Sequence, residues 1–118
     1  MAKTYENLKI WQEAVVLATE IYSLTGKFPK EEMFGLTSQL RRAVISISSN
    51  IAEGAGRGSK KDNSRFIDMA LGSLNEVESL LAVSFELSFI DTAKYESLKE
   101  KLKNLGALIG GYRKYLHK

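Results

Sequence analysis

Four basic residues and three glycines meet in one short stretch of the sequence. Positions 56–65 contain four basic residues against one acidic residue: Arg57, Lys60, Lys61 and Arg65. The glycines alternate with other residues as Gly54, Gly56 and Gly58. Each costs a helix about 1 kcal/mol relative to alanine, so we expect the chain to turn here and a new helix to begin at Lys60. Glycine amides and a helix N-terminus attract anions, so the pattern predicts a phosphate-contacting edge, with an ordinary solvated turn as the alternative.

A polar stripe lies upstream, on the predicted helix that precedes this turn. Its members are Gln39, Arg42, Ser46, Asn50 and Glu53. Asparagine and serine are poor residues for a helix interior because their side chains compete for backbone hydrogen bonds. The stripe therefore indicates a subunit or partner interface, although a solvated face would show the same pattern. The neighbouring Arg41 is a further candidate for phosphate contact, and both arginines could instead pair with carboxylates of the next helix.

Residues that could support catalysis are scarce. The chain contains one histidine, His117, and no cysteine. A two-histidine metal site and a thiolate site are therefore excluded. The glycine run lacks the P-loop pattern, because Ser59 stands where the second glycine of that motif belongs. We expect no enzymatic activity, no metal and no cofactor, and we expect His117 to be exposed and mobile.

Length and composition predict one soluble all-α domain over residues 1–118. The chain is long enough to bury roughly two-thirds of its extended surface. No segment approaches the ~20 apolar residues of a membrane span, and the N-terminus does not resemble a signal peptide. The absence of cysteine agrees with a cytoplasmic location. A net charge of +3 is compatible with nucleic-acid binding but too small to demonstrate it.

Hydrophobic periodicity predicts four helices. The first runs from Asn7, as N-cap, to about Thr25, and Gly26 closes it in a left-handed conformation. Its apolar line is Leu8, Trp11, Val15, Ala18 and Tyr22, widened by Ala14, Leu17 and Ile21. In the connection KFPKEEMFG we expect both Phe28 and Phe34 to pack on the bundle, with room for one helical turn between them.

The other three helices carry apolar stripes of their own. The second begins at Leu36, ends between Glu53 and Gly56, and presents Leu36, Leu40, Val44, Ile47 and Ile51. The third, capped by Ser59, runs from Lys60 to about Phe89 and presents Phe66, Ala70, Ser73, Val77, Leu80, Ser84 and Leu87. Asp91 caps the fourth, whose seam is Tyr95, Leu98, Leu102, Leu105, Ile109, Tyr112 and Leu116. Short connections predict an up-and-down antiparallel four-helix bundle.

The sequence also resembles a known family. The resemblance rests on LKIWQEA from Leu8, on Phe28 and Pro29, and on FGLTSQLRRA from Phe34. It continues through NIAEG from Asn50, with Arg57, and through ALGSLNE from Ala70. These segments, in this order, resemble the four-helix bundle proteins encoded in intervening sequences of bacterial 23S ribosomal RNA genes, also called the S23 ribosomal protein family. The match covers about residues 5–87, and the fourth predicted helix agrees only in pattern.

The resemblance implies a homopentamer. Members of the family are small four-helix bundles reported as pentamers, and related accessory proteins of diversity-generating retroelements work with a reverse transcriptase and nucleic acid. Two functions follow as expectations. One is RNA or DNA binding through the basic edge. The other is a scaffold for a partner protein, or a purely structural assembly. The resemblance supplies no catalytic residues.

Overall fold

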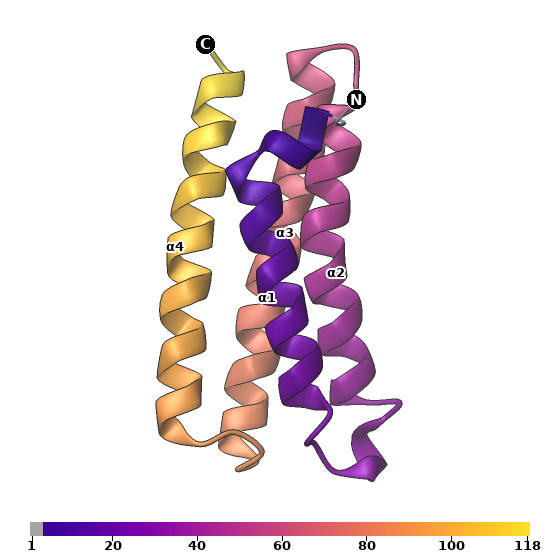
Figure 1. Cartoon of the computed structure of the whole chain (residues 1–118), viewed down its shortest axis with the longest axis vertical. Helices are drawn as coiled ribbons and strands as arrows, with labels where there is room; N and C mark the ends of the chain where they lie inside the picture. Colours follow the sequence, from indigo (N-terminus) through magenta and orange to yellow (C-terminus); the bar gives the residue numbers. More distant parts are fainter. Residues whose placement is uncertain (1–3) are drawn as a thin grey trace.

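The structure, a computed structural model, describes residues 4–118 and contains four long helices. They are α1 (Lys9–Thr25), α2 (Leu36–Ala55), α3 (Lys60–Glu86) and α4 (Thr92–Leu116). Two 3₁₀ helices accompany them, η1 (Thr4–Asn7) and η2 (Lys30–Glu32). Successive helices run antiparallel, so the α2–α3 turn and the C-terminus share one end of the bundle and the other two connections share the opposite end (Figure 1). The predicted all-α, up-and-down four-helix bundle is confirmed.

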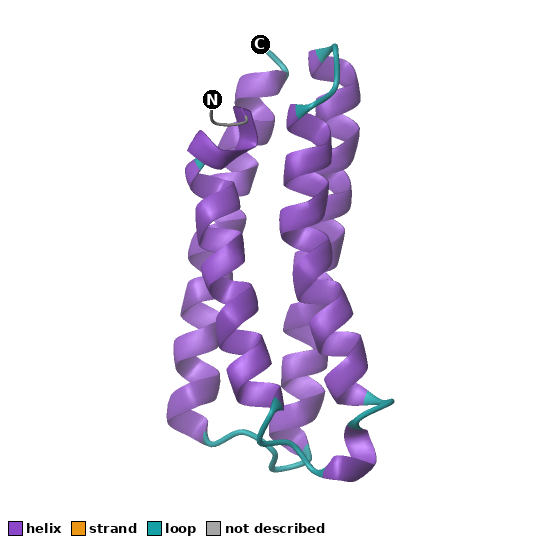
Figure 2. Cartoon of the chain, turned by 45° about the vertical axis from the view of Figure 1, so that its right-hand side comes forward, coloured by secondary structure: helices purple, strands orange, loops and turns teal. Residues whose placement is uncertain are grey.

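The helices pack in the cyclic order α1, α2, α3, α4. The α2–α3 contact is the most extensive and the α1–α4 contact is the least extensive of the four. Figure 2 shows the molecule as an α1–α4 pair beside an α2–α3 pair. A single ion pair within the described residues spans α1 and α4, with Lys101 Nζ 2.7 Å from Glu20 Oε1. The bundle is therefore held most firmly along α2 and α3.

The core confirms the predicted stripes of α2 and α4. Leu40, Val44, Ile47 and Ile51 are fully buried, and in α4 the seam from Leu98 to Leu116 is buried except at Tyr112. Helix α1 differs, because its core face is Ile10, Ala14, Leu17, Ala18 and Ile21. Tyr22 is exposed, and Trp11 is half-buried in edge-to-face contact with Tyr5. Within the first predicted line Ala18 is buried and the other members lie at the edge of the core, whereas the residues predicted to widen it, Ala14, Leu17 and Ile21, are all buried.

Helix α3 buries part of its predicted stripe. Its buried apolar residues are Ile67, Ala70, Leu74, Val77 and Leu81. The helix ends at Glu86, before the predicted Phe89, and Leu87 is exposed. Ser88 then adopts a φ of 64°, which turns the chain toward α4. Three members of the predicted stripe, Ala70, Val77 and Ser84, are fully buried. Three others, Phe66, Ser73 and Leu80, are half-buried at the border of this face.

Ser59 and Asp91 are confirmed as helix caps, Gly26 occupies its predicted C-cap position in another conformation, and the prediction of Asn7 as an N-cap is wrong. Ser59 Oγ accepts a hydrogen bond from the Asp62 amide at 3.1 Å, and Asp91 Oδ1 accepts one from the Lys94 amide at 2.7 Å. Asn7 belongs to η1, and Leu8 occupies the N-cap position of α1 without a side-chain bond. Gly26 has a φ of −61°, so it continues a right-handed turn.

The two phenylalanines of the α1–α2 connection differ in burial. Phe28 is buried, and its ring lies 5.5 Å from that of Phe89. Phe34 is 96% exposed, so the expectation that it packs on the bundle is wrong. The expected single helical turn is present as η2, and the Glu32 carboxylate accepts a hydrogen bond from the Leu36 amide at 3.1 Å. The connection is thus fixed at Phe28 and at the start of α2, and between these two points Phe34 faces solvent.

Candidate nucleic-acid interface

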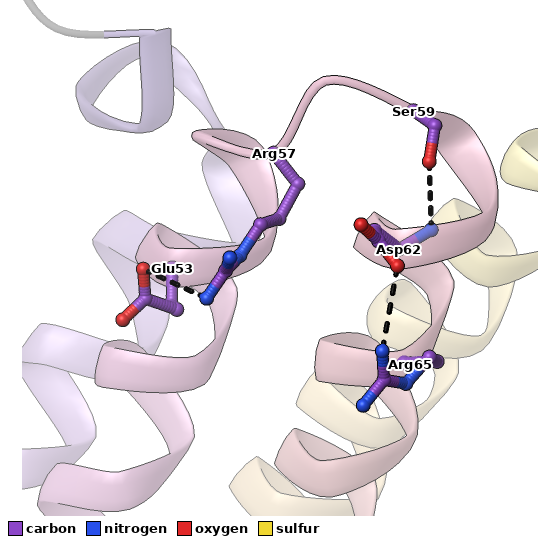
Figure 3. Close-up of polar contacts among 5 residues, drawn as sticks. All are labelled: Glu53, Arg57, Ser59, Asp62 and Arg65. Carbon is purple, nitrogen blue, oxygen red and sulfur yellow. Dashed lines mark hydrogen bonds and ion pairs between the residues drawn. The ribbon is translucent and has the colours of Figure 1, made fainter.

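The predicted basic cluster lies at the α2–α3 end of the bundle. Two of its arginines have carboxylate partners (Figure 3): Arg57 lies 3.6 Å from Glu53 Oε2, and Arg65 lies 3.4 Å from Asp62 Oδ1. The first pair joins α2 to the turn that follows it, the second lies within α3, and both face solvent. Exposed pairs of this kind contribute about 0 to 1 kcal/mol, so a phosphate group can compete for either arginine.

The two lysines of the cluster are less committed. Neither Lys60 nor Lys61 forms an ion pair within residues 4–118. Lys60 Nζ lies 5.0 Å from the centre of the Tyr115 ring, which places it over the end of α4. Both residues belong to the first turn of α3, where free amides and the helix dipole add positive potential. These lysines are the best placed cations for an incoming anion.

The C-terminal end of α4 completes this surface. His117 Nε2 lies 2.8 Å from Ser64 Oγ, and the side-chain amide of Asn63 donates a hydrogen bond to the Tyr112 hydroxyl at 3.0 Å. Arg113 is hydrogen-bonded to Asp68. His117 is thus exposed, as expected, but held by a side chain of α3. We define the basic end as residues 53–68 together with 112–118, which carry seven basic and three acidic side chains.

Sequence reasoning did not assign the end of α4 to this surface. The helix order could have predicted this contribution, because in an up-and-down antiparallel bundle the end of the fourth helix lies beside the start of the third. Lys114 and Lys118 join the cluster for that reason. The pKa of Arg113 is raised above its ordinary value, first by the hydrogen bond to Asp68 and then by the charge of that carboxylate. This contact therefore favours the charged form of Arg113.

A close helix crossing positions the start of α3. Gly54 is buried in α2, and a Cβ atom at this position would lie 2.6 Å from Asn63 Oδ1 and 3.1 Å from the Asn63 carbonyl oxygen. Asn63 Oδ1 is buried and has no hydrogen-bond partner within the described chain. Only glycine lets the two helices approach this closely. The crossing thus fixes where the Lys60 and Lys61 turn begins relative to α2.

Arg41 lies elsewhere. Its guanidinium donates hydrogen bonds to Thr25 Oγ1 at 2.9 Å and to the Tyr22 carbonyl at 3.3 Å, and it covers the Tyr22 ring at 4.6 Å. Arg41 lies fourteen residues before the end of α2 at Ala55, which is roughly 21 Å of helix, and Arg57 lies beyond that end. The structure therefore does not bring Arg41 to the basic end. It joins α2 to the end of α1, whereas the sequence analysis considered pairing with the next helix.

The polar stripe of α2 divides into bonded and free residues. Ser46 Oγ accepts hydrogen bonds from Ser73 Oγ at 2.8 Å and from the side-chain amide of Asn50 at 3.0 Å. Ser46 thus bonds across the α2–α3 contact, and Asn50 bonds to Ser46 within α2. Gln39 and Arg42 are exposed without a side-chain bond in the described part of the chain, and Glu53 pairs with Arg57. The structure brings two of the five residues into one hydrogen-bonded group and leaves Gln39 and Arg42 on the surface.

Residues 4–118 contain neither a candidate metal site nor a candidate membrane span. No group of three or more acidic, histidine or cysteine side chains is placed to hold a metal ion in this range. No helix in the same range is both long and apolar enough to cross a bilayer. The surface that stands out chemically is the basic end.

Taken together, the fold and its basic end define a small helical-bundle protein with a cationic polar tip. The chain belongs to the family of 23S rRNA-intervening sequence proteins, whose sequence model matches residues 6–111. This confirms the family suggested by the sequence motifs, and it extends the match through most of α4.

A solved structure supports the fold assignment. The chain is similar to a protein of unknown function of the S23 ribosomal protein family from Bacteroides thetaiotaomicron VPI-5482, with a TM-score of 0.82 and 24% sequence identity. The similarity covers 89% of this chain and 95% of the other. No curated protein matches the chain at a significant level.

Proposed function

We propose that this protein is a non-enzymatic homo-oligomer, a pentamer as the family resemblance implies, that binds RNA through its basic end. The observation that carries the proposal is the convergence of two segments on one tip. Residues 53–68 and 112–118 come from opposite halves of the bundle, and together they carry an excess of four positive side chains. Several copies arranged in a ring would multiply the weak affinity of each tip.

The chemistry of the tip fits phosphate better than base recognition. The cations are long, exposed side chains around a helix N-terminus, and the aromatic rings nearby are already covered by them: Arg57 lies 4.6 Å from the centre of Phe66, and Lys60 covers Tyr115. Binding of this kind neutralises phosphates and releases counterions, so it weakens steeply as salt rises. We therefore expect shape-dependent binding of structured RNA with little sequence preference.

The test compares two double variants that remove the same charge from opposite ends. Lys60→Gln with Lys61→Gln removes the uncommitted lysines of the basic end. Lys27→Gln with Lys30→Gln is the matched control in the α1–α2 connection. Fluorescence anisotropy with a labelled structured RNA, from low to moderate salt, gives the slope of log K against log salt. Each lost phosphate contact reduces that slope by about 0.7 to 0.9, so the first variant should lose about 1.4 to 1.8.

The control variant should bind like the wild type. Equal losses in both variants would mean that the net charge of the chain, and not its basic end, attracts the RNA. Binding that is insensitive to salt and to both variants would favour the alternative function, a scaffold for a partner protein. A duplex DNA of the same length that binds as tightly as the RNA would remove the preference for RNA.

A further inference from the structure

Phe34 is presented to solvent by a rigid segment. Its side chain is 96% exposed, and the preceding Met33 is 50% exposed. The segment is nevertheless fixed on both sides, by Phe28 in the core and by the hydrogen bond from the Leu36 amide to Glu32. Backbone hydrogen bonds of 2.9 to 3.1 Å also close the turns around Glu32, Met33 and Gly35. A pre-ordered apolar side chain loses little conformational freedom when it is buried by a partner.

A shallow apolar hollow lies on a different surface of the chain. It has a volume of about 350 Å³, lies between α1 and α2, and is lined by Val15, Ala18, Thr19, Tyr22, Ile45 and Ser48. Tyr22 and Ile45 are 43% and 42% exposed. Two of the three hydroxyl groups of the lining are satisfied within their own helices, by Thr19 bonding to the Val16 carbonyl and Ser48 to that of Ile45. The third belongs to Tyr22, whose side chain reaches solvent. The hollow therefore offers mainly apolar surface.

The charges around the two features are complementary. Glu31, exposed, and Glu32 precede Met33 and Phe34. On the hollow, the Arg41 guanidinium covers the Tyr22 ring at 4.6 Å. Exposed Arg42 lies three residues before Ile45, and therefore on the neighbouring surface of α2. The connection as a whole is neutral, because Lys27 and Lys30 balance the two glutamates. The complementary charges are therefore Glu31, next to the apolar tip, and Arg42, at the rim of the apolar hollow.

We infer that Phe34 of one copy inserts into the α1–α2 hollow of a second copy of this chain. The contact is heterologous, because the tip and the hollow are different surfaces, so each copy still offers a free tip and a free hollow after the first contact. Repetition of such a contact builds a ring if the rotation closes. The inference rests on the oligomer of the proposed function and identifies a contact that builds it.

Cysteine crosslinking tests the contact directly, since the natural chain contains no cysteine. Met33→Cys places a thiol beside the tip, and Thr19→Cys places one on the wall of the hollow. Two full-length proteins with different tags, one carrying each substitution, are mixed and oxidised. We expect a crosslinked species that contains both tags, and little crosslink in either protein alone. Equal crosslinking of Met33→Cys with itself would show a tip-to-tip contact and overturn the inference.

A second measurement uses the mass of the assembly. Phe34→Ala should raise the dissociation constant by roughly 30-fold or more, since it removes a buried phenylalanine from the contact. The matched control is Leu87→Ala, another exposed apolar residue at the same end. It should leave the mass unchanged in light scattering across a concentration series. A wild-type protein that stays monomeric throughout, or equal losses in both variants, would overturn the inference.

A charge exchange provides the third arm. Arg42→Glu should weaken the assembly, and adding Glu31→Arg in the same chain should restore at least part of the lost affinity. Failure of any restoration would remove the charge pairing from the inference. RNA binding is scored separately: a crosslinked assembly that ignores RNA would contradict the proposed function alone, and a protein that binds RNA without the mixed crosslink would contradict this inference alone.

Discussion

The two ends of the bundle differ in the side chains that they expose to solvent. At the basic end, side chains of α3 and α4 bond to one another, through Asn63 with Tyr112 and Ser64 with His117, and excess positive charge remains. At the opposite end, which we define as residues 26–36 and 86–95, three basic side chains meet four acidic ones and the apolar Phe34 faces solvent. One end is thus suited to a polyanion, and the other to an apolar protein surface. The same four helices support both because each end is built from different turns.

The largest effect should come from the pair of phenylalanines at the apolar end. Phe28→Ala removes a buried ring that packs on Phe89, and it should lower the free energy of unfolding by about 3 to 5 kcal/mol. Phe34→Ala should change it by less than about 0.5 kcal/mol, because the ring has no contacts to lose within the chain. Urea unfolding below the concentration of assembly measures both. Similar losses would mean that Phe34 packs on its own bundle.

A smaller loss is expected from the glycine at the basic end. Gly54→Ala places a methyl group 2.6 Å from Asn63 Oδ1 and 3.1 Å from backbone, so α2 and α3 must separate, which should cost about 2 to 3 kcal/mol. Gly58→Ala is the control, since nothing lies within 4 Å of its Cβ position. Gly58→Ala should leave the unfolding free energy unchanged or slightly higher. A tolerated alanine at Gly54 would contradict the close crossing that positions Lys60.

The polar contacts between α3 and α4 should have a moderate effect. Tyr112→Phe deletes the hydroxyl that accepts from the Asn63 amide, and it should destabilise the protein by about 1 kcal/mol. Tyr115→Phe is the matched control: Tyr115 is half exposed, and its hydroxyl forms no side-chain hydrogen bond in residues 4–118. Thermal melts followed by circular dichroism compare the two. Indistinguishable melting temperatures would mean that packing alone holds the end of α4 at this surface.

The smallest effect on stability is expected from a substitution at Asp68, and it should be accompanied by a change in RNA binding. Asp68→Asn releases Arg113 from an exposed ion pair, and solvent screening makes the loss of stability small. The freed guanidinium adds one cation to the basic end, so the salt slope for RNA should increase by about 0.7 to 0.9. Glu86→Gln removes the same charge from the other end of α3 and should not affect the slope. A slope that rises equally in both variants would erase the difference between the ends.

Residue patterns anticipated much of the fold. Ser59 and Asp91 act as caps because a side-chain oxygen at the right spacing is sufficient for that role, whatever the rest of the chain does. The stripe of α2 was also correct, since its apolar residues have one possible face. In α1 two overlapping apolar lines compete, and contacts with α2 and η1 decide between them. Local periodicity carries no information about those neighbours.

The site was anticipated in part. The basic residues of the α2–α3 turn are contiguous in sequence, so their grouping could be predicted. The contribution of α4 depends on helix order, and the position of Arg41 depends on a hydrogen bond to Thr25 that no spacing rule reveals. Phe34 shows a further limit. Hydrophobicity predicts that a side chain avoids water, but it does not say whether the cover comes from the same chain.

The unequal helix contacts also have a kinetic consequence. Because α2 and α3 are consecutive and share the most extensive contact, they form an antiparallel hairpin with little loop-closure entropy to overcome. Helix α1 meets α4 across the least extensive contact, and those helices come from the two ends of the sequence. We expect native-state hydrogen exchange to show two cooperative units, with the amides of α2 and α3 protected longest and those of α4 released first. Each such opening of α4 would detach His117 from Ser64, so the basic tip would be assembled and dismantled many times during the life of one folded molecule.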